Sequence, residues 1–256
     1  MHPVLLKIGP LSIYTYGVFA AIGLLFGISL ALRQAKKEGY DPQKILDLFF
    51  YSILAGIIGS RVFYVVQHLS TFQGNLLDAF KLWEGGLVFY GGLLFAVPVA
   101  WFLLKRQNLS FWKTFDLIAP SMAIGQALGR IGCFYAGCCY GIPTQLPWGV
   151  TFTHPESLAL KGIPLHPAQL YDAGAGGIIF FILIVFRKHT RFPGQLSLMY
   201  LCLHSIFRFF IELFRGDPRL WIGGHTITLT QVISISIFWL SIGLYFYFRN
   251  KQLKRE

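Results

Sequence analysis

The sequence has few charged side chains for its length. Only 13% of its 256 residues are Asp, Glu, Lys or Arg, whereas 55% are hydrophobic and 17% are aromatic. The mean hydropathy is +0.57. A soluble globule of this size needs more charge on its surface. The composition therefore excludes a soluble protein and predicts an integral membrane protein.

Cysteine is also scarce, and no two of the four cysteines have the Cys-x-x-Cys spacing of a zinc ribbon. Cys133, Cys138 and Cys139 nevertheless lie close together in the sequence. This spacing disfavours a zinc site, so we expect no metal and no cofactor. A disulfide is possible on an oxidising face of a membrane, and small buried packing residues are the simplest interpretation.

No basic segment precedes the first apolar run. Only Lys7 comes before it, whereas Arg33, Lys36 and Lys37 follow it. The run is also longer than the apolar core of a signal peptide. We therefore expect it to stay in the membrane, with the N-terminus outside.

Seven apolar runs approach the roughly 20 residues that a helix needs to cross a bilayer. They predict an all-α integral membrane protein with seven transmembrane helices. The sequence shows no internal repeat and no second domain, so we expect a single transmembrane domain over residues 1–256. The runs are 13–32, 47–66, 87–104, 115–132, 168–186, 194–214 and 229–248.

The net charge of +11 follows the order of these runs. Basic residues gather in the first, third and fifth connections and in the C-terminal tail. The positive-inside rule then predicts a cytoplasmic C-terminus and an N-terminus on the outer, periplasmic side. The charge therefore reflects membrane topology, and we expect no nucleic-acid partner.

Two outer connections are longer than a turn. Residues 67–86 mix apolar and polar side chains, which predicts an arm lying in the membrane interface. Residues 142–166 contain four prolines and predict an irregular periplasmic cap with one short strand near 150–152.

Three arginines, Arg61, Arg130 and Arg208, lie inside predicted spans, each in the outer half. The carboxylates at that depth, Asp172 and Glu212, are too few to balance them, and an uncompensated cation near hydrocarbon is costly. A guanidinium stays charged when desolvated and binds phosphate or carboxylate oxygens two at a time. We therefore expect an anionic ligand, and in an outer leaflet the obvious phosphate belongs to a lipid.

The sixth span has one polar stripe. At about 100° per residue, His204, Arg208, Glu212 and Arg215 fall on one face, and aromatic residues cover the rest. Arg208 and Glu212 have the spacing of an i,i+4 ion pair.

The sequence resembles the bacterial prolipoprotein diacylglyceryl transferases. Six blocks follow the family's order over nearly the whole chain, and only their combination is specific. They are Tyr16-Gly17, Gly59 to Tyr64, Tyr90-Gly91-Gly92, Gly129-Arg130-Ile131-Gly132, His166 to Asp172, and Arg208-Phe209 with Glu212 and Arg215.

The resemblance implies a seven-helix enzyme of the bacterial inner membrane whose active site faces the periplasmic leaflet. Its substrates would be phosphatidylglycerol and a prolipoprotein signal peptide with a lipobox cysteine. The diacylglyceryl group would move to the cysteine thiol, forming a thioether and releasing glycerol phosphate. The leaving phosphate ester develops negative charge, which needs preorganised donors.

The resemblance also assigns roles to residues. Arg130 and Arg208 would hold the phosphate, Glu212 would orient Arg208, and two glycines would let the backbone approach the ligand closely. The predicted catalytic residues are Arg130, Arg208, Glu212, Tyr90 and His204, and the predicted substrate-binding residues are Tyr16, Arg61, Gly91, Gly92, Cys133 and Arg215.

Some positions depart from the family pattern and leave the thiol base open. Tyr90 stands where many members have histidine, His204 where they have tyrosine, and Cys133 and Cys138 where they have asparagine and an acidic residue. His204 is a candidate base because imidazole titrates near neutral pH. Tyr90 fits better as a hydrogen-bond donor to lipid.

Two other functions remain open. A paralogue on the same scaffold could bind or modify an anionic lipid without accepting lipobox peptides, as the departures suggest. A small-anion transporter is the other alternative. Polar residues confined to one leaflet and the lack of internal symmetry both argue against a transporter.

Overall fold

The computed structural model describes residues 2–9, 11–72, 76–81, 85–222 and 226–253. The chain divides into two compact units, which we describe separately. The first comprises Met1–Leu30 and Phe115–Glu256, and the second comprises Ala31–Thr114. The single domain expected over residues 1–256 therefore stays a prediction.

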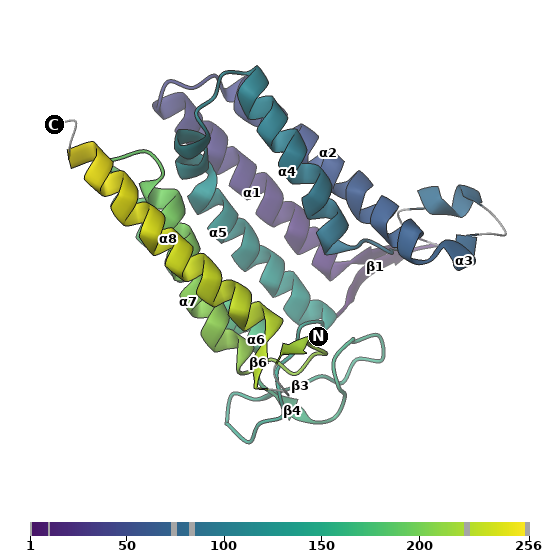
Figure 1. The fold of residues 1–256 in the computed structure, drawn as a ribbon. Helices are drawn as coiled ribbons and strands as arrows, with labels where there is room; N and C mark the ends of the chain where they lie inside the picture. The colour runs from purple at the N-terminus through teal and green to yellow at the C-terminus, as the bar shows by residue number, and fades with distance from the viewer. Residues whose placement is uncertain (1, 10, 73–75, 82–84, 223–225, 254–256) are drawn as a thin grey trace. The chain divides into compact units, whose positions relative to one another are not determined.

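A long helix forms at the place of each apolar run (Figure 1). Five of them, α1, α2, α5, α6 and α8, are long and apolar enough to cross a membrane by length and composition. The predicted all-helical membrane class is confirmed. The helices are α1 (Thr15–Lys37), α2 (Pro42–Gln67), α4 (Phe89–Arg106), α5 (Phe111–Ala136), α6 (Ala168–Phe186), α7 (Gln195–Glu212) and α8 (Leu229–Leu253).

The start of α7 is capped by a carboxylate from another helix. Gly194 precedes α7 in the left-handed conformation, with φ 97°, and donates its N–H to Asp116 Oδ2 at 2.6 Å. Asp116 Oδ1 accepts the N–H of Ser197 at 2.8 Å. Since the first N–H groups of a helix have no partner within it, Asp116 on α5 satisfies one of them, that of Ser197, and joins the two helices.

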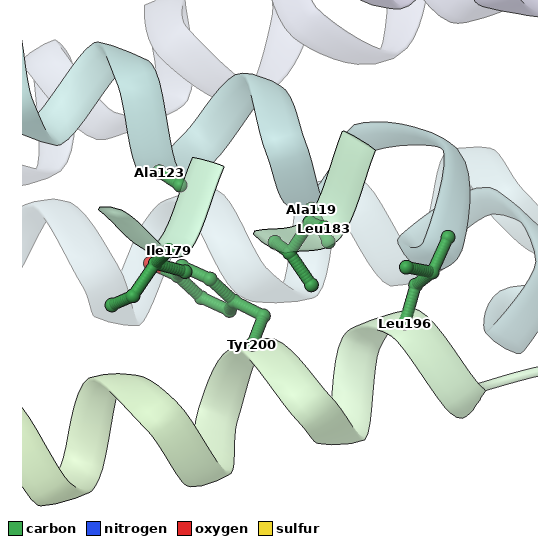
Figure 2. Close-up of a cluster of buried hydrophobic side chains, with 6 residues drawn as sticks. All are labelled: Ala119, Ala123, Ile179, Leu183, Leu196 and Tyr200. Atoms are coloured by element: carbon green, nitrogen blue, oxygen red, sulfur yellow. The ribbon is translucent and has the colours of Figure 1, made fainter. Parts of the chain in front are cut away.

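The core of the first unit lies among α5, α6 and α7. Figure 2 shows its buried side chains, with the small alanines of α5 against larger residues of α6 and α7. Small residues let membrane helices approach closely without a water-driven hydrophobic force. The cluster consists of Ala119, Ala123, Ile179, Leu183, Leu196 and Tyr200.

Glycines bring α2 and α4 together in the second unit. A Cβ on Gly59 would lie 2.5 Å from the Gly91 oxygen, and one on Gly92 would lie 2.5 Å from Ser60 Oγ. The second unit also contains α3 (Leu69–Phe72) and η1 (Leu76–Phe80), a 3₁₀ helix, within the predicted arm 67–86. Residues 73–75 and 82–84 of that arm lie outside the described residues.

Three short antiparallel hairpins accompany the helices of the first unit. β1 (Val4–Ile8) pairs with β2 (Leu11–Tyr14), and β5 (Trp221–Ile222) pairs with β6 (Ile227–Thr228). Neither hairpin was expected. β3 (Val150–Thr151) pairs with β4 (Pro164–Leu165) in the region of the predicted cap, which confirms the strand predicted near 150–152.

Backbone hydrogen bonds join the segment after α5 to the start of α6 and to the end of α7. Gly141 N–H donates to His166 O at 3.0 Å, and Ile142 N–H donates to Phe214 O at 2.9 Å. Gly216 N–H returns a bond to Tyr140 O at 2.9 Å. These backbone bonds hold the ends of three helices in a fixed arrangement around the polar residues described next.

Candidate active site

Residues from α5, α6 and α7 line one small cavity in the first unit. Arg130 comes from α5, Asp172 from α6, and His204 and Arg208 from α7, with Gln126 beside them. The cavity volume is about 30 Å³, enough for only about two water molecules. Arg130 and Arg208 thus meet at one place, as the sequence predicted, but the cavity is too small for a phosphate unless side chains move.

Asp172 lies at the centre of the arginines. Its Oδ2 is 3.3 Å from Arg130 Nε, 3.8 Å from Arg208 Nη1 and 4.0 Å from Arg215 Nη1. One carboxylate oxygen is therefore shared by three guanidinium groups. These distances are longer than those of charge-assisted hydrogen bonds, which lie near 2.7–2.9 Å. The arrangement offsets positive charge but leaves guanidinium N–H groups able to form further hydrogen bonds.

Glu212 is buried beside Arg208. Its Oε2 lies 2.8 Å from Arg208 Nη2, which confirms the expected i,i+4 pair, and 3.9 Å from Arg215 Nε. Arg208 Nη1 is buried and has no hydrogen-bond partner within the described residues. Since buried donors are almost always satisfied in native proteins, this nitrogen indicates that an acceptor belongs here.

Two charged residues that the sequence did not point to, Asp217 and Arg219, follow the end of α7. Arg215 donates from Nε to Asp217 Oδ1 at 2.9 Å, and Arg219 Nη1 donates to the Glu212 backbone oxygen at 2.5 Å. With these, four arginines (130, 208, 215 and 219) face three carboxylates (172, 212 and 217), which leaves an excess of one positive charge among the described groups. An excess of arginine over carboxylate charge therefore persists.

His204 and Tyr16 also belong to this part of the first unit. His204 lines the cavity, and its ring packs at 5.7 Å against Tyr200, whose hydroxyl donates to Gln126 Oε1 at 3.0 Å. Tyr16 on α1 approaches the Gly129-Arg130-Ile131-Gly132 block, because a Cβ on Gly132 would lie 3.1 Å from the Tyr16 backbone oxygen. Both residues are thus placed near Arg130, and their functional roles stay predictions.

Three thiols gather where α5 ends. The sulfur atoms of Cys133, Cys138 and Cys139 all lie within 4.8 Å of one another. Hydrogen bonds from Cys133 and Cys138, followed by the charges of Arg215 and Arg130, lower the pKa of the Cys139 thiol. Hydrogen bonding to Cys133 and Cys139 raises the pKa of the Cys138 thiol. Arg215 and Arg130 thus lie close enough to Cys139 to interact with its sulfur electrostatically.

The second unit holds the other predicted site residues, and Arg61 is fully engaged there. Its Nε donates to Ala79 O at 2.7 Å, its Nη2 to Asp78 O at 2.8 Å, and its Nη1 to Gly85 O at 2.6 Å. Carbonyl dipoles of the arm thus compensate this buried charge, and the substrate-binding role of Arg61 stays a prediction.

Tyr90, Gly91 and Gly92 lie at the start of α4. A Cβ on Gly91 would lie 2.5 Å from the Gly59 oxygen, so the close approach that needs a glycine here is to α2. The Tyr90 side chain is 62% exposed. The structure thus supplies a packing reason for both glycines, and the substrate-binding roles of this segment stay predictions.

The family model for prolipoprotein diacylglyceryl transferase matches residues 3–247. The chain belongs to the prolipoprotein diacylglyceryl transferase family. The match covers almost the whole chain, including both units and every polar residue described above. The predicted family is therefore confirmed.

Several relatives within the prolipoprotein diacylglyceryl transferase family are similar over nearly their full length. The chain is 34% identical to the phosphatidylglycerol–prolipoprotein diacylglyceryl transferase of Clostridium tetani over 245 residues, 96% of each protein. It is 33% identical to that of Finegoldia magna over 257 residues, 100% of this chain and 99% of the relative. It is 35% identical to that of Bordetella parapertussis over 254 residues, 96% of this chain and 95% of the relative.

Within this transferase scaffold, sequence reasoning undervalued Asp172 and missed Asp217. Asp172 was part of a family block and was counted only as a charge, although it contacts three arginines. Asp217 follows Arg215 by two residues, a spacing that permits the bidentate pair seen here, with Nη2 at 2.5 Å from Oδ2. The available signal was that short spacing just beyond the end of the helix.

Proposed function

We propose that the protein transfers the diacylglyceryl group of phosphatidylglycerol to the lipobox cysteine thiol of a prolipoprotein. The products are a thioether-linked lipid and glycerol phosphate. The family match and the names of its full-length relatives support this activity. The structural observation that carries it is the meeting of Arg130, Arg208 and Arg215 around one carboxylate oxygen.

The proposed lipid site forms when the phosphate of phosphatidylglycerol replaces Asp172 as the shared partner of the arginines. Each guanidinium can then donate to phosphate oxygens in a fork, which Asp172 does not allow at 3.3–4.0 Å. Arg208 Nη1 gains the acceptor that it lacks. These donors also stabilise the charge that develops on the leaving phosphate ester.

Glu212 keeps Arg208 oriented in this proposal. The carboxylate is buried and holds Arg208 Nη2 at 2.8 Å. Glu212 and Asp172 are both already engaged by arginines. His204, which lines the same cavity, is therefore the side chain that we propose to accept the thiol proton.

The proposed topology has seven transmembrane helices, with the N-terminus and the active site facing the periplasm. Support comes from five helices that meet the criteria for a span and from the basic residues concentrated between alternate helices. α4 and α7 complete the set at the two remaining apolar runs. Residues 67–86 would then form an interfacial arm, and residues 142–166 a periplasmic cap, in a bacterial inner membrane.

A peptide-modification assay tests the activity. The purified protein is mixed with phosphatidylglycerol and a synthetic lipobox peptide, and the peptide is analysed by mass spectrometry. We expect a mass increase of one diacylglyceryl group on the cysteine, and no product with a Cys→Ser peptide. A folded sample that modifies no lipobox peptide with phosphatidylglycerol or another anionic lipid would favour a paralogue that only binds lipid.

A further inference from the structure

The three thiols at the end of α5 have no role in the mechanism above. We propose that Cys133, Cys138 and Cys139 bind one zinc ion, whose open fourth position holds the thiolate of the substrate cysteine during its alkylation. This site deepens the proposed transferase function and rests on it. The sequence spacing alone predicted no metal, and the structure changes that expectation by bringing the three sulfur atoms together.

The distances between the sulfur atoms suit a metal. Zinc–sulfur bonds are about 2.3 Å long, so two sulfurs of a tetrahedral site lie about 3.8 Å apart. All three sulfurs here lie within 4.8 Å of one another, so adjustments of about 1 Å in the side chains complete the geometry. Thiolate ligands select thiophilic ions such as zinc.

The backbone supports this arrangement. Cys139 adopts the left-handed conformation, with φ 57°, which is uncommon for a residue other than glycine, asparagine or aspartate. The turn brings the side chains of two consecutive cysteines to the same cluster. Gln169 of α6 fixes the segment by donating from Nε2 to Cys138 O at 2.7 Å. A strained backbone of this kind persists where the surrounding structure holds it, and it is common at functional sites.

The composition of the cluster indicates an open coordination position. No histidine or carboxylate joins the three cysteines among the described residues. Structural zinc sites have four protein ligands, whereas catalytic sites have three and leave the fourth position to water or substrate. Zinc with three thiolates carries a net charge of −1. The electrostatic interactions of Cys139 with Arg130 and Arg215 would offset that charge.

The cluster is placed for the transfer step, because Cys139 lies close enough to Arg130 and Arg215 to interact with both electrostatically. The substrate R–SH binds zinc as R–S⁻ and releases its proton to His204 or solvent, because a coordinating thiol is deprotonated. The sulfur then attacks the glycerol carbon that bears the phosphate ester. The S–C bond forms, the C–O bond breaks, and glycerol phosphate leaves with the electron pair toward Arg130 and Arg208. The zinc ion keeps its charge, and no oxidant or reductant is needed.

Metal content tests binding. The protein is purified without a polyhistidine tag, and zinc is measured by inductively coupled plasma mass spectrometry. We expect about one zinc per chain, and a loss of most of it in Cys133→Ser, Cys138→Ser and Cys139→Ser. Cys202→Ser on α7 is the matched control and should retain the metal. Zinc-free wild-type protein with a disulfide among these thiols, or with copper(I) in their place, would overturn the proposal.

Cobalt substitution tests the fourth position in the wild-type protein, so no variant has to fold. Cobalt(II) bound by thiolates absorbs in the near ultraviolet and visible regions. Adding the lipobox peptide should intensify the sulfur-to-cobalt band, and the Cys→Ser peptide should not. An unchanged spectrum at saturating peptide would show that the substrate thiol does not bind the metal.

Activity separates failure of this inference from failure of the proposed function. Chelation of zinc should lower kcat on the order of 100-fold, the scale of a lost thiol-activating group, and added zinc should restore it. Full activity in demonstrably zinc-free protein would end the zinc proposal while leaving the transferase function intact. Zinc binding by a folded protein that never modifies the peptide would instead contradict the transferase function, and with it the role given to the metal.

Discussion

At the scale of single residues, buried arginines have different hydrogen-bonding partners in the two units. Arg61 is buried, but four backbone oxygens of the arm, those of Asp78, Ala79, Gly85 and Gly86, accept its N–H groups. Arg208 is also buried and keeps one nitrogen without a hydrogen bond. The sequence shows only that both are arginines within apolar runs. Which one is compensated depends on contacts between distant segments, and these cannot be predicted from local spacing.

The shared position of Asp172 makes it the most informative residue to change. In Asp172→Asn, three guanidinium groups lose the charge that they share. We expect KM for phosphatidylglycerol to fall, because an anion meets less competition, and kcat to fall by about 10-fold, because the donors are less preorganised.

Steady-state kinetics with varied lipid in mixed micelles would measure this split. Asp47→Asn on α2 is a suitable control, because within the described part of the chain Asp47 accepts a side-chain hydrogen bond from Gln43 of its own helix alone. A rise in KM at unchanged kcat would mean that Asp172 helps to bind the lipid instead of competing with it.

At the scale of elements, length and hydropathy predicted the helices well and the strands poorly. α6 spans the predicted residues 168–186 because its apolar run ends where basic residues begin. The hairpin of β1 and β2 was not predicted, because Leu11–Tyr14 continues directly into the first apolar run. α1 starts only at Thr15, whose N–H donates to Pro3 O at 2.9 Å. That contact joins residues whose pairing is invisible in a hydropathy pattern.

The backbone hydrogen bonds that join the helix ends around the site depend on two glycines that face each other, Gly141 and Gly216. A Cβ on Gly216 would lie 2.5 Å from the Gly141 oxygen and 3.0 Å from the Ile142 nitrogen. We expect Gly216→Ala to force the backbone segments apart, to lower the melting temperature by several degrees, and to reduce activity.

Gly174→Ala on α6 is the matched control, since among the described residues a Cβ there would meet no atom within 4 Å apart from its chain neighbours and the nearby backbone of its own helix. That variant should melt at or slightly above the wild-type temperature, because alanine favours a helix. Thermal unfolding in detergent followed by intrinsic fluorescence gives both values. Equal melting temperatures for the two variants would mean that the backbone hydrogen bonds between the helix ends do not need a glycine at position 216.

At the scale of the whole molecule, the sequence predicted the membrane class, the family and most of the polar residues that now surround one cavity. It could do so because span length and charge placement are set by the bilayer, and because the family blocks carry the site. It did not reveal the three-thiol cluster, since the left-handed turn at Cys139 is a backbone feature. The sequence also could not show that Asp172 contacts three arginines at once.

The proposed orientation predicts which connections are reachable from outside the cell. A membrane-impermeant maleimide should label Lys161→Cys, in the cap region, on spheroplasts. It should label Lys113→Cys, in the first turn of α5, only after lysis. Both original side chains are exposed, so access to the membrane side decides the result. Wild-type protein supplies the background from its own thiols. The opposite labelling pattern would invert the topology and move the site to the cytoplasmic leaflet.

The central claim is that Arg130 and Arg208 together hold one lipid phosphate, and lipid binding by arginine variants tests it most directly. Binding of phosphatidylglycerol to the purified protein is titrated for Arg130→Gln, Arg208→Gln and Arg208→Lys, with Arg249→Gln at the exposed end of α8 as control. Losing a charge-assisted contact of about 1.5–3 kcal/mol should weaken binding by about 10- to 100-fold. Lysine should recover only part of it, because it lacks the planar fork. Wild-type affinity in both glutamine variants would contradict the account.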